Sequence, residues 1–354
     1  MSDTPEILIE ERRCLGLITL NRPEALNALT LGMVRSMRTA LDRWAADPEI
    51  ACVAVRGAGR KAFCAGGDIL TIYRQKQEGH AEESLVFWAE EYALNRLIKR
   101  YPKPYLAFID GIVMGGGVGV SIHGSHRIAG ERFQFAMPEV GIGFFPDVGA
   151  TYVLPRLPWR SGYYLALTGK RIGRGFAAAL GLVTHSVEGA RFDAIIDGLA
   201  EGRPAHRVLV GETVPHGEAP ELAHIGTIAQ CFGGEAVEAI LAALDDFAAR
   251  GAAFAAEAAA AIRAKSPTSL KVTLEALRRA RELEIEDALK LEYRICRHII
   301  DGHDLYEGIR AQVIDKDRHP RWQPETLAGV SAEAVAAHFK ELDRAELAFD
   351  GGAP

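Results

Sequence analysis

In the first half of the chain, short apolar runs alternate with a segment in which apolar residues recur every three or four positions. Short apolar runs, the length of buried or half-buried strands, occur at residues 7–11, 15–20, 51–55 and 105–109. Between the second and third runs, apolar side chains recur every three or four residues, which predicts a helix: Met33, Met37, Leu41 and Trp44. Thr30 is a suitable N-cap for this helix, and Asp47-Pro48 ends it. Strands that alternate with helices favour an α/β fold.

The second half of the chain has a purely helical pattern. From about residue 235 it is rich in alanine, and Ser266-Pro267 supplies a cap and a first-turn proline for a helix. Three leucines then lie on one helical face: Leu270, Leu274 and Leu277. A further helix is expected at about 285–300. The predicted organisation is a core that carries the active site, a helical region, and a final helix with a tail: 1–230, 231–330 and 331–354.

Composition narrows the class of protein. The chain has 354 residues, of which 48% are hydrophobic and 25% charged, and its formal net charge is −6. Its basic residues are scattered, which argues against nucleic-acid binding. The five cysteines form no CxxC pair, as expected for reduced thiols in an intracellular protein. No run of about 18 apolar residues could span a membrane. The N-terminal segment lacks signal and transit features, so we expect a cytoplasmic protein.

Glycine is concentrated at two places, residues 63–68 and 111–119. Glycine inside an element costs stability, so such clusters indicate tight turns, close packing, or backbone that approaches a ligand. Each cluster follows an apolar strand-like run and leads into a helix-like run. Backbone N–H groups at two such junctions could form an oxyanion hole. The dinucleotide motif GxGxxG and the nucleophile motif GxSxG are both absent from the sequence.

Two carboxylates, Glu139 and Asp147, interrupt an otherwise apolar, glycine-rich segment at 135–149. Burial would raise the pKa of such a carboxyl and suit it to proton transfer near neutral pH. Each could instead be a helix cap or a solvated turn residue. His123 and His126 have no third candidate ligand nearby, so we expect them to be solvated or packed in the core, and we expect no metal site.

Five motifs resemble the crotonase superfamily in their order and spacing: NRP at 21–23, LNAL at 26–29, KAFCAGGDI at 61–69, MGGG at 114–117 and MPE at 137–139. The resemblance covers nearly the whole chain. It implies a spiral of ββα turns followed by a helical C-terminal region. It also implies an acyl-CoA substrate, with coenzyme A part of that substrate and no separate cofactor. The two N–H groups that polarise the thioester would be those of Gly67 and Gly116, and homo-oligomers are common among the relatives.

Three positions narrow the resemblance within the superfamily. Enoyl-CoA hydratases carry a catalytic glutamate where this chain has Gly119, match Glu139, and usually have glycine where this chain has Asp147. Dienoyl-CoA isomerases share the acidic residue at 147 but keep a carboxylate at 119. The combination in this chain is similar to the 3-hydroxyisobutyryl-CoA hydrolases. Further segments typical of that group are EEY at 90–92, FPDVG at 145–149, LPRL at 154–157, YEGIRA at 306–311, IDKD at 314–317 and PRW at 320–322.

This resemblance implies hydrolysis of a short 3-hydroxyacyl-CoA, namely 3-hydroxyisobutyryl-CoA of valine catabolism, to the free acid and coenzyme A. Glu139 would then either activate water or attack the thioester to give a mixed anhydride. Asp147, Glu91 and Gly116 would contact the substrate. Two alternatives stay open at this point: a hydratase or isomerase acting on another acyl-CoA, and a catalytically silent CoA-binding protein.

Overall fold

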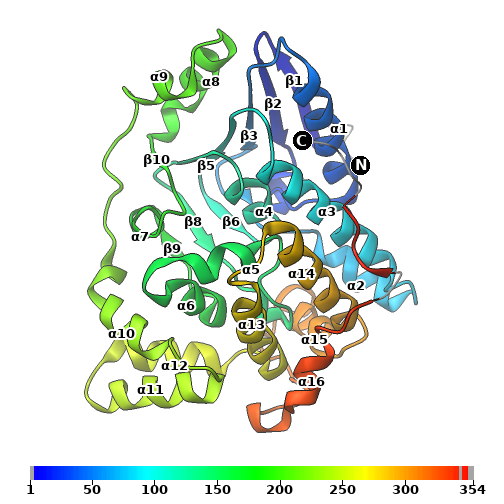
Figure 1. The fold of residues 1–354 in the computed structure, drawn as a ribbon, viewed down its shortest axis with the longest axis vertical. Coiled ribbons are helices and arrows are strands. Elements are labelled where there is room, and N and C mark those ends of the chain that lie inside the picture. Colours follow the sequence, from blue (N-terminus) through cyan, green and yellow to red (C-terminus); the bar gives the residue numbers. More distant parts are fainter. Residues whose placement is uncertain (1–3, 343–344, 350–354) are drawn as a thin grey trace. The chain divides into compact units, whose positions relative to one another are not determined.

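The computed structural model of the chain describes residues 4–342 and 345–349 (Figure 1). These residues divide into two compact units, each assembled from several segments of the chain. Unit 1 comprises the described residues up to Asp68, Glu90–Phe135 and Ile172–Ala219. Unit 2 comprises Ile69–Ala89, Ala136–Arg171 and the described residues from Pro220 onward. The division predicted at residues 230 and 330 follows chain order, whereas these units alternate along the chain. That division stays a prediction.

A six-stranded sheet lies at the centre of unit 1 (Figure 1). Its strands, in spatial order, are β1 (Ile7–Arg12), β2 (Leu15–Leu20), β3 (Cys52–Gly57), β5 (Tyr105–Ile109), β7 (His126–Ala129) and β10 (His185–Ser186). β1 and β2 pair antiparallel, and all later neighbours pair parallel. β2 and β5 are buried at every position. Strands covered on both faces need continuous apolar sequence, which explains the short apolar runs that predicted them.

A smaller sheet accompanies the first. Its strands are β4 (Ala62–Cys64), β6 (Ile112–Met114), β8 (Gln134–Ala136) and β9 (Ile172–Gly173). Three times the chain leaves a strand of the larger sheet and enters the smaller sheet within a few residues, at β3–β4, β5–β6 and β7–β8. Helices α2 (Ile69–Gln77) and α4 (Gly116–Ile122) follow β4 and β6 directly. The repeat is the expected spiral of ββα turns, so the predicted α/β class is confirmed.

The first helix shows why the sequence pattern predicted it. α1 (Leu31–Ala46) begins at Thr30, whose side chain accepts a hydrogen bond from the Met33 N–H at 3.2 Å. Its predicted apolar face, which includes Met37, Leu41 and Trp44, is buried, and the helix packs against β1 and β2 (Figure 1). α3 (Glu83–Lys99) begins in unit 2 and continues into unit 1. The remaining α-helices of unit 1 are α7 (Arg174–Ala179), α8 (Phe192–Ala200) and α9 (Ala205–Leu209).

Unit 2 is helical. Its α-helices after α2 and the start of α3 are α5 (Ala150–Val153), α6 (Ser161–Thr168), α10 (Ile225–Cys231), α11 (Val237–Ala249), α12 (Ala253–Arg263), α13 (Pro267–Ala280), α14 (Ile285–Ile299), α15 (Asp304–Ile309) and α16 (Ala332–Ala337). The Ser266 side chain caps α13 by accepting from the Ser269 N–H at 3.1 Å. The predicted helical C-terminal region is therefore confirmed. Part of its predicted tail, residues 343–344 and 350–354, lies outside the described residues.

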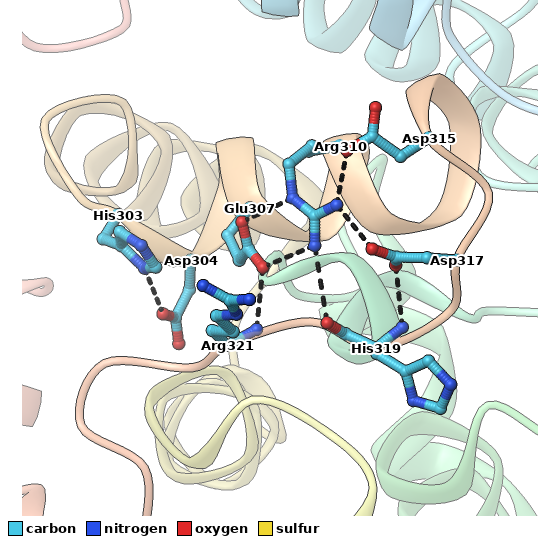
Figure 2. A network of polar contacts seen from close by, with 8 residues as sticks. All are labelled: His303, Asp304, Glu307, Arg310, Asp315, Asp317, His319 and Arg321. Atoms are coloured by element: carbon cyan, nitrogen blue, oxygen red, sulfur yellow. Dashed lines mark hydrogen bonds and ion pairs between the residues drawn. The ribbon is translucent and has the colours of Figure 1, made fainter.

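The C-terminal motifs YEGIRA and IDKD form one polar network around Arg310 (Figure 2). The guanidinium donates to both carboxylate oxygens of Glu307 at 2.8 and 2.9 Å, and to Asp315 and Asp317 at 2.6 and 2.7 Å. The Glu307 carboxylate also accepts from the Arg321 N–H at 2.8 Å. Arg310 begins a short π-helix, Arg310–Ile314, directly after α15. These motifs therefore fix the path of the chain between α15 and residue 321.

Helices and cysteines fit the expectations from composition. None of the helices formed by residues 4–342 and 345–349 is both long and apolar enough to cross a membrane. All five cysteines are free thiols.

Candidate active site

Gly67 and Gly116 lie in two loops at one edge of the small sheet in unit 1. Gly67 follows β4, whereas Gly116 follows β6 and opens α4. β4 and β6 are parallel neighbours, so the loops at their carboxyl ends lie side by side. A Cβ placed on Gly66 would be 4.0 Å from the Gly116 nitrogen, and one on Gly116 would be 3.4 Å from the Gly66 carbonyl carbon. The fold of unit 1 thus brings the two predicted donor residues together.

The N–H groups of Gly67 and Gly116 lie outside the pairing of their loops. The Leu29 N–H donates to the Gly66 carbonyl and the Asp68 N–H donates to the Leu29 carbonyl, both at 2.9 Å, and this pairing does not use the Gly67 N–H. Gly116 is the first residue of α4, where N–H groups have no acceptor within the helix. Its N-cap, Gly115, has φ 47° and ψ −126°, a conformation that side chains disfavour. Both N–H groups can therefore donate to an oxygen that carries developing charge.

Glu91 approaches the Gly116 backbone from α3. A Cβ on Gly116 would lie only 2.4 Å from the Glu91 Oε1 atom and 3.1 Å from the Leu29 Cδ1 atom. A side chain at residue 116 would therefore have to displace the Glu91 carboxyl. The Glu91 side chain is 2% exposed, so a carboxyl predicted to contact substrate is buried beside a predicted donor. Gly116 and Glu91 are together in unit 1, as the resemblance requires of residues that contact one acyl group.

The NRP and LNAL motifs brace the loop after β4. The Asn27 amide is fully buried; it donates to the Ala58 and Ala62 carbonyls at 2.9 and 3.0 Å and accepts from the Arg22 N–H at 2.9 Å. The Arg22 guanidinium forms a 3.0 Å ion pair with Asp68, next to Gly67. Both motifs therefore have a structural role in unit 1: they hold the ends of β4 and the loop that follows it.

Glu139 and Asp147 lie in one segment of unit 2. Glu139 begins the 3₁₀ helix η2 (Glu139–Ile142), and the two side chains are 6% and 5% exposed. Burial raises the pKa of Glu139 well above its ordinary value of 4.5, and the negative charge of Asp147 raises it further. Among the described residues, the Glu139 Oε2 atom has no hydrogen-bond partner. Such a carboxyl is a good proton acceptor or nucleophile once it is ionised.

Aromatic rings pack around the turn between the two carboxyls. Phe144 stacks on Trp88 of α3 with ring centroids 5.4 Å apart, and Phe145 lies 4.7 Å from Phe144. Phe145 is fully buried. These rings fill the space around the turn with apolar side chains.

A third buried carboxyl, Glu292, was not predicted from the sequence. Glu292 lies on α14 and is 0% exposed. Its carboxylate accepts from the Gly149 N–H at 2.8 Å, from the Thr151 N–H at 3.1 Å and from the Thr151 hydroxyl at 2.5 Å. Burial and the charge of Asp147 raise the pKa of Glu292 to about 8. A signal did exist, because Glu292 interrupts the apolar stripe of α14 formed by Ala288, Leu289, Ile295 and Cys296.

Position 119 offers no acid or base. Gly119 is buried within α4, three residues after Gly116, so no side chain extends from it. His126 stacks on His185 with ring centroids 5.7 Å apart. Within residues 4–342 and 345–349, no group of three or more His, Cys, Asp or Glu side chains could hold a metal ion. Metal independence stays a prediction.

The sequence profile of the enoyl-CoA hydratase/isomerase family matches residues 15–339, almost the whole chain. The chain belongs to the enoyl-CoA hydratase/isomerase family. Curated relatives named mitochondrial 3-hydroxyisobutyryl-CoA hydrolase include the Rattus norvegicus protein, 41% identical over 98% of this chain and 92% of the rat protein. The Danio rerio protein of the same name is 42% identical over 97% of this chain and 91% of its own.

Solved structures of the enoyl-CoA hydratase/isomerase family confirm the fold but carry other names. The structure of a protein named carnitinyl-CoA dehydratase from Mycobacterium thermoresistibile has a TM-score of 0.92 and 42% identity, covering 98% of this chain and all of that one. That of a protein named enoyl-CoA hydratase from Rhodobacter sphaeroides has a TM-score of 0.90 and 40% identity, with the same coverage. Since hydrolase and hydratase names occur at equal identity, the choice between them depends on the site residues.

Proposed function

We propose that this chain hydrolyses 3-hydroxyisobutyryl-CoA to 3-hydroxyisobutyrate and coenzyme A, a step of valine catabolism. Full-length relatives at about 40% identity carry that hydrolase name. The observation that carries the choice of reaction is Gly119. Addition of water to a double bond needs one group to deliver the hydroxyl and another to deliver the proton. Glycine at 119 offers no second acid or base, and the Glu139 Oε2 atom has no hydrogen-bond partner among the described residues, so these residues support attack on a carbonyl better than hydration.

In this proposal the N–H groups of Gly67 and Gly116 hold the thioester oxygen. Their available N–H groups and neighbouring loops support that role. Negative charge that develops on the oxygen in the tetrahedral intermediate would be stabilised by both donors, and the loss of one such donor typically costs about 10²–10³-fold in rate.

Glu139 would deliver the attack on the thioester carbon. As a general base it takes a proton from water, and the hydroxide forms the new C–O bond while the thiolate of coenzyme A leaves. As a nucleophile it first forms a mixed anhydride with release of the thiolate, and water then cleaves the anhydride. One turnover in ¹⁸O-labelled water tests one form of the anhydride route. Label on the Glu139 carboxyl shows an anhydride opened at the enzyme carbonyl, whereas label in the product alone is expected both for direct attack by water and for an anhydride opened at the acyl carbonyl.

Asp147 and Glu91 would engage the acyl group and its 3-hydroxyl. A site built to hydrogen-bond a hydroxyl rejects the analogue that lacks it, because the buried polar group is left unpaired. Both carboxyls are at most 5% exposed, which supports such a role.

Two parallel assays test the reaction class. Release of free thiol from 3-hydroxyisobutyryl-CoA is the expected activity. Loss of enoyl absorbance on crotonyl-CoA would instead favour a hydratase, the activity for which the Rhodobacter sphaeroides protein is named. Binding of both thioesters without turnover would favour a silent CoA-binding protein and overturn the proposal.

The remaining parts of the proposal concern partners and setting. We propose that no metal or separate cofactor takes part, so a chelator should leave thiol release unchanged. A homo-oligomer in the cytoplasm is also proposed, although the animal relatives are named mitochondrial. Light scattering on the purified protein and cell fractionation test these two points.

A further inference from the structure

The turn that carries Asp147 has a backbone conformation that needs support. Val148 has φ +56° and Gly149 has φ +80°, so two successive residues adopt the left-handed region. That region is unfavourable for a β-branched side chain such as valine and persists only where the surroundings enforce it. Val148 is 1% exposed, so the strained residue is packed inside unit 2.

Glu292 supplies that support from α14, which packs against α5. One carboxylate oxygen accepts from the Gly149 N–H, and the other accepts from the N–H and the hydroxyl of Thr151. These three bonds hold both ends of a short stretch that starts two residues after Asp147. The Thr151 hydroxyl can donate to an ionised carboxylate or accept from a protonated one, so this contact survives in either state.

We propose that Glu292 is a positioning residue that holds the Asp147–Val148–Gly149 turn and thereby aims the Asp147 carboxyl at the 3-hydroxyl of the acyl group. This inference rests on the proposed hydrolase function. Glu292 reaches the turn through backbone N–H groups, so it acts on substrate only through Asp147. The charge of Asp147 also raises the pKa of Glu292.

The test compares two substrates that differ only in the hydroxyl, 3-hydroxyisobutyryl-CoA and isobutyryl-CoA. In Glu292→Gln one backbone N–H of the turn loses its acceptor, because an amide has a single acceptor oxygen. We expect the kcat/KM ratio of hydroxylated to plain substrate to fall by about tenfold. We also expect Glu292→Gln to add little to Asp147→Asn, because residues that act through one another are not additive.

A buried carboxyl whose hydrogen bonds lie outside the Asp147 turn serves as the control. Asp304 is 7% exposed and accepts from the Ser266 hydroxyl and the Gln323 N–H. Asp304→Asn should lower the unfolding midpoint while leaving the substrate ratio unchanged. If Glu292→Gln behaves as Asp304→Asn does, and Asp147→Asn alone lowers the ratio, the inference is overturned but the proposed function stands. If the wild-type protein cleaves neither thioester, the proposed function itself has failed, and this inference fails with it.

A second pair of variants covers the case in which Glu292→Gln does not fold. Thr151→Val removes only the hydroxyl contact, and Thr151→Ser keeps it. A lower substrate ratio in the valine variant that returns to wild type in the serine variant supports the inference. Equal ratios in both variants overturn it.

Discussion

The two groups of site residues place different kinds of chemistry in the two units. In unit 1 the proposed oxyanion donors are main-chain N–H groups, fixed by the ends of β4 and β6. In unit 2 the proposed groups are the carboxyl side chains of Glu139 and Asp147, and burial together with the charge of Asp147 raises the pKa of Glu139. The first group has no titratable atom and changes only if backbone moves. The second changes with a single isosteric substitution, so mutation and pH can separate their contributions.

Loss of the Glu139 carboxylate should have the largest effect on turnover. In Glu139→Gln the amide can neither accept a proton nor attack the thioester, so kcat should fall by about 10²–10⁴-fold. Folding should be unimpaired, because the substitution removes a buried ionisable group and keeps its shape. Thiol release from 3-hydroxyisobutyryl-CoA measures the first effect and urea unfolding the second. The exposed Glu282→Gln is the matched control and should behave as wild type. Near-normal turnover in Glu139→Gln would defeat the assignment.

Displacement of a backbone donor should have the next largest effect. In Gly116→Ala the new Cβ would lie 2.4 Å from the Glu91 Oε1 atom, so the Glu91 carboxyl, the donor loop or both must move. We expect kcat to fall by about 10²–10³-fold, as for removal of one oxyanion donor, together with lower stability. Gly173→Ala is the control, since a Cβ there meets nothing within 4 Å. If Gly116→Ala loses stability but keeps full turnover, the Gly116 N–H is not a donor.

The sequence predicted the main elements and the proposed site residues, but not the contacts that support the Asp147 turn. Apolar runs and helical spacing were enough for β2, β5 and α1, because full burial on both faces or along one stripe leaves a strong pattern. The motif resemblance indicated Gly67, Gly116, Glu91, Glu139 and Asp147. It could not indicate the support of the Asp147 turn by Glu292, since the contact joins residues 143 positions apart. Left-handed φ at Val148 was equally hidden, because nothing in a valine suggests it.

The buried carboxyls should make the stability of the protein depend on pH, which the backbone N–H groups of unit 1 cannot do. Glu139 and Glu292 both have pKa values raised above 4.5 in the folded protein, that of Glu292 to about 8. A group with a raised acid pKa favours the folded state in its protonated form, so stability is lost as pH rises from about 4.5 through the folded pKa. Glu139→Gln removes the part of this pH-dependent loss of stability that comes from Glu139. The unfolding free energy of this variant should therefore increase relative to that of the wild type as the pH rises from 5 to 7. A gap that stays constant with pH would show that Glu139 is not destabilised by its surroundings.

The Arg310 network should give a smaller effect of opposite sign (Figure 2). Hydrogen bonds from the guanidinium are the main reason why the pKa values of Glu307 and Asp317 lie below their ordinary values. Carboxylates with lowered pKa stabilise the folded protein above their unfolded pKa, and that stability is lost as pH falls through the folded pKa. Arg310→Gln should therefore lower Tm by about 1–3 °C at pH 7 and by less at pH 4.

Arg310→Lys is the matched variant, because it keeps the charge but cannot bind both Glu307 oxygens and two aspartates with one planar fork. An intermediate Tm for the lysine variant would show that geometry as well as charge holds the C-terminal motif together. Thiol release should be unchanged in both variants. Glu307 and Asp317 belong to the same unit as Glu139. Opposite pH trends in Arg310→Gln and Glu139→Gln would therefore show that burial, rather than membership of unit 2, sets the pKa of Glu139.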